Sequence, residues 1–159
     1  MSETVVEEYS QVVVFSLINQ EIGKKEDYGV SIDQVREIRP IESITKVPNA
    51  KSYIKGVMNL RGMIVPIFDV KEKLGFSNVA PSSKARILVA DVQSKLTGLL
   101  IDEIDQVMRI PVKEIETHLS GGLESLEYIK GVAKISGRLI VLLDIVKLLE
   151  SDTFYKSEA

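Results

Sequence analysis

The sequence contains no cysteine, no tryptophan and a single histidine. Without cysteine the chain cannot form disulfides, thiolate nucleophiles or cysteine-bound metal sites, a composition that suits a cytosolic protein. The first ten residues, "MSETVVEEYS", are acidic and lack the basic and then apolar pattern of a signal peptide. No apolar run approaches the roughly 18 residues needed to cross a bilayer. We therefore expect a soluble, cytoplasmic protein with no direct membrane insertion.

The sequence also lacks an excess of positive charge. Its 159 residues include 20 basic and 23 acidic side chains, which gives a net charge of −3. A broad electrostatic attraction to nucleic acid or anionic lipid is therefore not expected. Hydrophobic residues make up 45% and charged residues 27%, the ordinary balance of a folded protein. The length corresponds to a single domain, 1–159, that can bury a core without disulfides.

Residues able to perform catalysis are few. The one histidine, His118, lies in "ETHLSGGLES", a polar loop, where it can anchor neither a catalytic triad nor a typical zinc site. The carboxylate pairs Asp102/Asp105 and Glu124/Glu127 have the spacing of a solvated face, which we favour over a hydrolase site. No nucleotide-binding fingerprint occurs. We expect no catalytic residue, no metal and no cofactor.

The most informative feature is a phrase that occurs twice. "YIKGVMNLRGMIVPIFD" (53–69) is followed 75 residues later by "YIKGVAKISGRLIVLLD" (128–144), and eight of the 23 positions from 53 to 75 are identical in the second copy. Collinear matches precede it at smaller offsets, such as "IDQVREI" (32–38) with "IDEIDQV" (101–107) and "VVVFSLI" (12–18) with "RILVADV" (86–92). The chain is therefore two copies of one unit of about 70 residues.

Each copy carries the signals of a β-hairpin. Two apolar runs rich in β-branched residues are separated by Arg61-Gly62 in the first copy and by Ser136-Gly137 in the second. Glycine as the second turn residue supplies the positive φ that a tight hairpin turn needs. Pro66 cannot donate to a sheet, which predicts an edge strand or a bulge at that point.

A short helix is predicted after each hairpin. Asp69 and Asp144 follow the last strand of each copy and are suitable N-cap residues, and Asp69 with Glu72 has the spacing of a capping box. Several short strands with turns indicate an all-β fold of two small β-barrels packed on each other. We expect a first barrel at approximately 12–75 and a second at approximately 86–150, with termini partly exchanged or extended.

A connector and a tail complete the predicted organisation. "GFSNVAPSSK" (75–84) is rich in serine, proline and asparagine and is predicted to join the barrels. Residues 151–159 are predicted to form a C-terminal tail.

Comparing the copies separates shared from specific positions. Gly56 and its equivalent Gly131 are kept, which indicates a backbone requirement at a turn or bulge. Asn59 and Arg61, by contrast, are replaced by lysine and serine in the second copy. The planar guanidinium of Arg61, at a hairpin tip, suits a carboxylate or carbonyl on a partner. A plain exposed turn arginine is the equal alternative from these residues alone.

The sequence resembles the CheW family of bacterial chemotaxis coupling proteins. "YGVSIDQVREI" (28–38) and "VPNAKSYIKGVMNLRGMIVPIFDVKEKLG" (47–75) carry the resemblance, which extends over about 12–149. It implies two SH3-like five-stranded β-barrel subdomains packed side by side, with short helices and no enzymatic activity. It also implies an adaptor that couples the regulatory domain of the histidine kinase CheA to the cytoplasmic tips of methyl-accepting chemoreceptors. Such a protein is expected to be monomeric when isolated and to be recruited to membrane-associated receptor arrays.

The resemblance also implies site residues. Val35, Glu37 and Arg61 match positions associated with receptor and kinase coupling, with Gly56 beside them. Val35 and Ile38 would supply apolar contacts in a groove between the barrels, and Glu37 and Arg61 would orient a receptor helix. Core packing is the alternative for both apolar residues, and for Ile38 it is the interpretation that we favour. For Glu37 the alternative is an ordinary surface charge that supports solubility.

Two further positions complete the predicted receptor- and kinase-binding set. Asn59 lies in the hairpin motif, and Gly131 would lie near a pseudo-symmetric contact with the kinase, which is built from the same two-barrel module. A glycine required by a turn explains Gly131 equally well.

Two other classes of function stay open. Small β-barrels also bind single-stranded nucleic acid through a basic groove with stacking aromatic residues, but five tyrosines, four phenylalanines and an acidic balance make this unfavourable. An enzyme would need a pocket with perturbed carboxylates. We place both below the adaptor.

Overall fold

The computed structural model describes residues 7–76 and 81–150. Part of the predicted connector, residues 77–80, and the predicted tail, 151–159, lie outside the described residues, as does the acidic start, 1–6.

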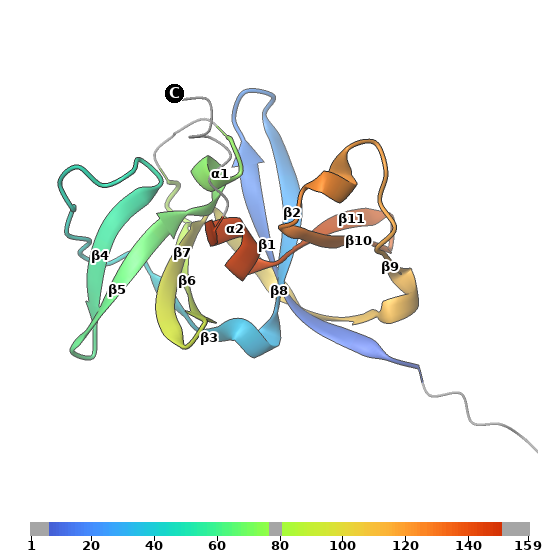
Figure 1. Cartoon of the computed structure of the whole chain (residues 1–159), viewed down its shortest axis with the longest axis horizontal. Coiled ribbons are helices and arrows are strands. Elements are labelled where there is room, and N and C mark those ends of the chain that lie inside the picture. Colours follow the sequence, from blue (N-terminus) through green and yellow to red (C-terminus); the bar gives the residue numbers. More distant parts are fainter. Residues whose placement is uncertain (1–6, 77–80, 151–159) are drawn as a thin grey trace, which may run out of the picture.

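Short strands make up most of the described chain, with helices of a few residues between them (Figure 1). The strands are β1 (Tyr9–Asn19), β2 (Lys24–Ser31), β3 (Val35–Pro40), β4 (Ile54–Leu60), β5 (Met63–Asp69), β6 (Arg86–Val92), β7 (Lys95–Ile101), β8 (Glu103–Pro111), β9 (Ile115–Glu116), β10 (Ile129–Ile135) and β11 (Arg138–Leu143). The helices are α1 (Val70–Lys73) and α2 (Ile145–Glu150), with 3₁₀ turns η1 (Ile32–Gln34), η2 (Val112–Glu114) and η3 (Leu123–Ser125). The predicted all-β class is confirmed.

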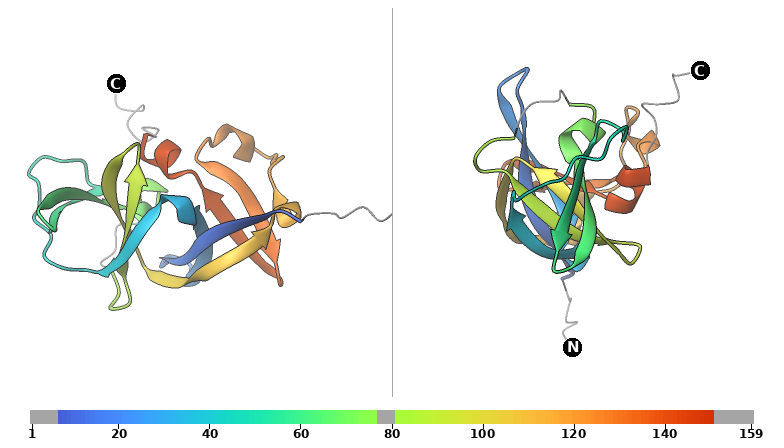
Figure 2. Two further views of the ribbon diagram at one scale, coloured as in Figure 1. Left: turned by 90° about the horizontal axis from the view of Figure 1, so that it is seen from below. Right: turned by 90° about the vertical axis from the view of Figure 1, so that its left-hand side faces the viewer.

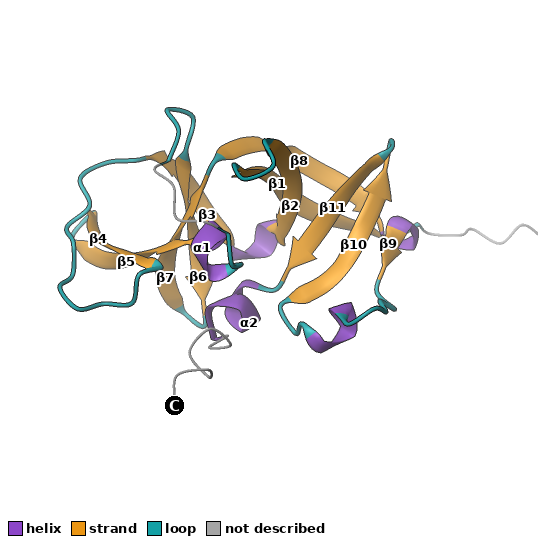
Figure 3. Cartoon of the chain, turned by 90° about the horizontal axis from the view of Figure 1, so that it is seen from above, coloured by secondary structure: helices purple, strands orange, loops and turns teal. Residues whose placement is uncertain are grey.

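The described strands form two sheets that lie side by side (Figures 2 and 3). One is six-stranded, in the order β8-β1-β2-β11-β10-β9, and the other is five-stranded, in the order β3-β6-β7-β5-β4. The two edge strands of the first sheet, β8 and β9, are joined by the single turn η2, so the sheet curls into a barrel. The edge strands of the second sheet, β3 and β4, are likewise consecutive, and a bridge between Thr45 and Val57 links their connection to β4.

Each sheet combines strands from both copies of the repeat. The opening hairpin of the first copy, β1–β2, pairs with β8 and β11, and the opening hairpin of the second copy, β6–β7, pairs with β3 and β5. Parallel pairing joins β11 to β2 and β5 to β7 in the same way. The ranges 12–75 and 86–150 therefore describe the sequence repeats, whereas each barrel is built from both.

This exchange creates a third hydrophobic core between the two barrel interiors. One face of β1 and β2 packs against one face of β6 and β7, and the two helices add Val70, Ile145 and Leu148. The other larger members of this central core are Val13, Phe15, Leu17, Tyr28, Val30, Leu88, Leu99, Ile101 and Leu143. The opposite faces of the same strands line the barrel interiors. Burial on both faces explains why β1 and β6 read as continuous apolar runs rather than alternating ones.

The predicted helix caps are largely confirmed. The Asp69 carboxylate accepts hydrogen bonds from the backbone N–H groups of Lys71 (3.0 Å) and Glu72 (3.3 Å), and Asp144 accepts one from Lys147 N–H (3.1 Å). The reciprocal half of the capping box is wrong, because the Asp69 backbone N–H donates to the Tyr53 carbonyl at 2.7 Å and the Glu72 carboxylate accepts from the Lys55 ammonium at 2.8 Å.

The prediction for Pro66 is wrong about its strand. β5 lies between β7 and β4 and is not an edge strand. Pro66 is tolerated because the pairing of β5 with β7 begins only at Ile67. The absence of a backbone N–H on Pro66 therefore removes no hydrogen bond between these two strands. Within 7–76 and 81–150, no helix has the length and hydropathy that a membrane span requires.

Candidate protein-binding surfaces

The tip of the first hairpin is a tight turn with two left-handed residues. Arg61 has a φ of 50° and Gly62 a φ of 85°, and Ser136 (49°) and Gly137 (77°) repeat the pattern in the second copy. Positive φ at both central positions matches the twist of the flanking strands. The Asn59 side chain accepts a hydrogen bond from Gly62 N–H at 2.7 Å. Asn59 therefore stabilises the turn from which the Arg61 side chain projects.

Arg61 forms an ion pair with Glu37 on β3, the other edge strand of the same sheet. The Arg61 guanidinium, 67% exposed, lies 2.5 Å from one Glu37 oxygen, and Arg39 contacts the other at 3.0 Å. Arg39 also reaches Glu42 at 2.7 Å. These guanidinium groups, Arg61 first, hold the pKa of Glu37 below its usual value. Because β3 and β4 are opposite edges of one sheet, the pair also shows that the sheet curls until its edges meet.

Val35 and Ile38 are on different faces of β3. Val35 is half-buried and packs against the central core, whereas Ile38 is 43% exposed. The core packing favoured for Ile38 is therefore wrong. Burial alternates along β3, so that Val35, Glu37 and Arg39 face inward and Ile38 faces outward.

Gly56 and Gly131 are required by the backbone. Both follow a register shift at the start of their hairpins, as expected for a bulge. A Cβ on Gly56, whose φ is 145°, would lie 2.3 Å from the carbonyl oxygen of Thr45. A Cβ on Gly131 would lie 2.9 Å from that of Glu116. Both glycines are buried, and Gly131 lies in the other sheet from the Glu37–Arg61 pair.

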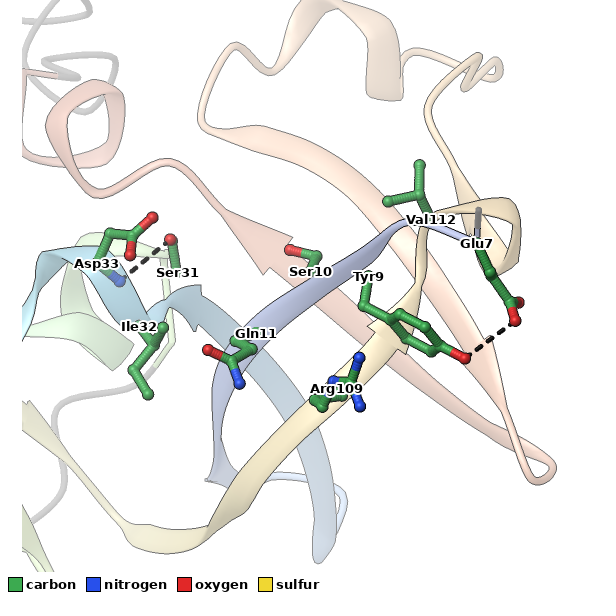
Figure 4. A pocket seen from close by; sticks show the side chains of 9 residues that line it. All are labelled: Glu7, Tyr9, Ser10, Gln11, Ser31, Ile32, Asp33, Arg109 and Val112. Carbon is green, nitrogen blue, oxygen red and sulfur yellow. Dashed lines mark hydrogen bonds between the residues drawn. The ribbon is translucent and has the colours of Figure 1, made fainter. Parts of the chain in front are cut away.

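A groove of about 610 Å³ borders the central core, and the sequence did not point to it (Figure 4). It is lined by β1, by η1 with Ile32 and Asp33, and by Arg109 of β8. The Arg109 guanidinium lies 4.1 Å from the centre of the Tyr9 ring, a cation–π contact. The Tyr9 hydroxyl donates to Glu7 at 2.9 Å and, with Lys113, lowers the pKa of that carboxyl. Polar groups of both signs therefore surround this groove.

Both hairpins expose a large aliphatic side chain at the equivalent position. Ile64 is 68% exposed and Leu139, its counterpart 75 residues later, is 62% exposed. Beside Ile64 a second groove of about 560 Å³ runs between β5 and α2, with Phe68 and Leu149 in its walls. From the sequence, only the polar residues of the hairpin tips were considered, and these positions were therefore not predicted. The repeat alignment nevertheless shows that the two aliphatic residues are equivalent.

Arg138 forms ion pairs from the second hairpin at a position where the first hairpin has an uncharged residue. Arg138 contacts Asp27 at 3.1 Å and Asp105 at 2.8 Å. Its counterpart in the first copy is Met63, which is exposed. The two hairpins thus share an exposed aliphatic residue, Ile64 or Leu139, and differ in the side chains beside it.

The candidate catalytic residues are not brought together. Among 7–76 and 81–150 no three His, Asp or Glu side chains form a group that could hold a metal ion. His118 is exposed, and its backbone N–H donates to Glu116. The solvated face predicted for Asp102 and Asp105 is wrong for Asp102, which is buried. Glu127 is exposed, and the Glu124 side chain is outside the described part.

Comparison with known proteins gives one consistent picture. Residues 11–153 match the family model described as the CheW-like domain. The chemotaxis protein CheW of Klebsiella aerogenes is 32% identical over 151 residues, covering 94% of this chain and 86% of that protein. The CheW of Rhizobium meliloti is 33% identical over 138 residues, covering 86% and 88%. The crystal structure of the scaffolding protein TtCheW from Thermoanaerobacter tengcongensis superposes with a TM-score of 0.76 at 30% identity, covering 91% of this chain and 94% of that one.

Proposed function

Since this chain belongs to the CheW-like family, we propose that it is a non-enzymatic adaptor of chemotaxis signal transduction. It couples the histidine kinase CheA, through the regulatory domain of that kinase, to the cytoplasmic tips of methyl-accepting chemoreceptors. The structural similarity to TtCheW, a scaffolding protein, supports this proposal. The observation that carries it is the arrangement of two barrels around one shared core, with exposed hairpin ends and a groove on the six-stranded barrel, where β2 leads through η1 into β3.

The receptor tip is proposed to lie along the groove and the adjoining edge of β3. A helix needs an apolar strip bordered by polar groups. Val107, 52% exposed and paired in register with the core residue Val13, supplies apolar surface on β8. β3 then leads from η1 to Glu37, whose partner Arg61 supplies a positive charge at the far end. In this proposal Glu37 and Arg61 orient the helix.

The kinase is proposed to bind the hairpin ends. Isolated exposed aliphatic residues are common, but Ile64 and Leu139 recur at the same place in both copies and adjoin an apolar groove in the first. The regulatory domain of CheA is built from the same two-barrel module, so its own barrel ends can pair pseudo-symmetrically with these. Gly131 contributes indirectly, by fixing the bulge from which the second hairpin starts.

The cellular setting follows from these partners. The protein is placed in the cytoplasm, as a monomer when isolated, and is recruited to receptor arrays beside the membrane. No cofactor is needed. Weak individual contacts gain strength there because neighbouring partners raise one another's effective concentration.

Binding of single-stranded nucleic acid is not favoured by the aromatic residues. Phe15 stacks on Tyr28 in the central core, and Tyr53 stacks on Phe68. Tyr53 is buried, and Lys73 lies over its ring at 4.2 Å. These rings are therefore engaged within the protein, whereas bases stack on exposed rings.

Reconstitution tests the adaptor proposal. CheA and a chemoreceptor from the same source, the receptor in lipid vesicles, are mixed with and without this protein, and kinase autophosphorylation is followed. We expect the protein to raise receptor-controlled kinase activity, and Arg61→Glu to lose most of that effect. Kinase activity that is indifferent to the protein would contradict the proposal.

A further inference from the structure

The four-residue helix α1 buries two lysines. Lys71 and Lys73 are both among the buried residues of the protein. Lysine is almost never fully buried unless it is paired, because removing its charge from water is costly. Neither side chain belongs to the surfaces described above. Lys73 lies over the Tyr53 ring, whereas the burial of Lys71 requires a separate explanation.

The partner of Lys71 is the equally buried Asp102. The Lys71 ammonium lies 3.1 Å from the Asp102 carboxylate, and the two side chains are 5% and 4% exposed. The same carboxylate oxygen accepts a hydrogen bond from the backbone N–H of Ile18 at 2.7 Å. One carboxylate thus receives a charged donor and a backbone donor from separate elements.

These elements belong to different sheets. Lys71 follows β5 of the five-stranded sheet, and Ile18 lies on β1 of the six-stranded sheet. Asp102 occupies the single position between β7 and β8, where the chain passes from one sheet to the other. Figures 1 and 3 show α1 at this junction.

The pair occurs in only one of the two copies. The repeat places Asp33 opposite Asp102 and Val146 opposite Lys71. Asp33 is exposed at the groove, and valine cannot form an ion pair. The two-barrel repeat can therefore be built without this ion pair, which indicates a purpose specific to one side of the molecule.

We propose that Lys71 and Asp102 are positioning residues that fix the orientation of one barrel relative to the other. Apolar contacts in the central core are non-directional and tolerate small rotations. A buried ion pair does not, because any rotation that separates the charges leaves each of them buried and unpaired. Asp102 leads directly into β8, which lines the groove, and Lys71 follows β5, which carries Ile64. The pair therefore holds the groove and the first hairpin end in register for two partners at once, an inference that rests on the proposed function.

The first test measures orientation without any partner. Because the chain has no cysteine, Lys95→Cys and Lys134→Cys place the only two spin labels, one on each sheet. Distances between the labels are compared in the wild type, in Asp102→Asn and in the pair Lys71→Met with Asp102→Asn. Asparagine keeps an acceptor for the Ile18 N–H. We expect a single narrow distance in the wild type and a distribution at least twice as broad in both variants.

A second measurement separates positioning from stability. The single variant leaves a buried lysine unpaired and should lower Tm by about 10 °C, whereas removing both charges should recover at least half of that loss. In the double variant we expect binding of the CheA regulatory domain alone to stay within twofold. Binding of a receptor-tip fragment and that domain together should weaken about tenfold.

A surface ion pair within one sheet is the matched control. Arg36 and Asp91 lie 2.8 Å apart on β3 and β6, and replacing them by methionine and asparagine should leave the label distances unchanged. An unchanged narrow distance in the Lys71/Asp102 double variant would overturn the inference, whatever the partners do. A wild type that binds neither probe would refute the proposed function, and the distances would still decide the role of the pair.

Discussion

Replacing Gly56 by alanine tests whether this glycine acts through the fold or through a partner. A φ of 145° costs an L-residue roughly 1–3 kcal/mol. The new Cβ would lie 2.3 Å from the Thr45 carbonyl oxygen, so the strands must separate there. Thr45 and Val57 exchange two backbone hydrogen bonds of 2.8 Å at this point, each contributing about 1 kcal/mol net. The expected loss is roughly 3–5 kcal/mol, which lowers Tm by about 10 °C.

Thermal unfolding followed by circular dichroism measures this loss. Gly62→Ala is the matched control, because its φ is 85° but nothing lies within 4 Å of the added Cβ. That control should cost about 1 kcal/mol, or about 3 °C. Gly56→Ala protein that unfolds within 3 °C of the wild type and yet loses partner binding would refute the structural role.

Three further predictions concern the first hairpin and the helix after it. Arg61→Glu places two carboxylates together, and it should weaken binding of a receptor-tip fragment at least tenfold in calorimetry while Tm stays within a few degrees. Ser136→Glu, at the equivalent turn, should bind normally, and equal losses in both variants would contradict a specific role of Arg61. The folded-state pKa of Glu37 is lowered from 4.5, so its ion pairs stabilise the fold above that pH and are lost as pH falls through the lower value. Carboxyl carbon NMR should show a midpoint below 4.5 that rises when Arg61 becomes alanine; an unmoved midpoint would mean that Arg61 is not the cause. Asp69→Ala removes the cap of α1 and should cost about 1–2 kcal/mol in urea unfolding; a loss below 0.5 kcal/mol would show that the cap contributes little.

The repeat made most of the fold predictable from sequence. Two copies of a Gly-containing hairpin followed by a capping aspartate specify strands, turns and helix starts locally, and the structure has them at those positions. The contact between Glu37 and Arg61 could not be predicted from the sequence. It depends on the curling of a five-stranded sheet until β3 and β4 meet, which no local pattern encodes.

The features that could not be predicted depend on how strands and side chains pair over long distances in the sequence. The exchange of opening hairpins buries β1 and β6 on both faces, and a continuous apolar run is compatible with that exchange and with an ordinary core strand alike. Ile38 was misplaced because it was grouped with Val35, although strand residues three positions apart lie on opposite faces, and Ile38 shares the exposed face of β3 with Arg36. Asp102 was taken for a surface acid because its partner, Lys71, lies 31 positions away on a different element.

The proposed adaptor role requires that a receptor and a kinase bind to separate surfaces of this protein. The most direct test is a titration of isotope-labelled protein with the CheA regulatory domain, and then with a receptor-tip fragment, reading backbone amide shifts. We predict that the kinase domain shifts amides around a hairpin end, Ile64 or Leu139, and that the receptor fragment shifts those of β3 and of the groove around Arg109. Shifts from both probes at one and the same surface, or no shifts at millimolar concentration, would contradict the account.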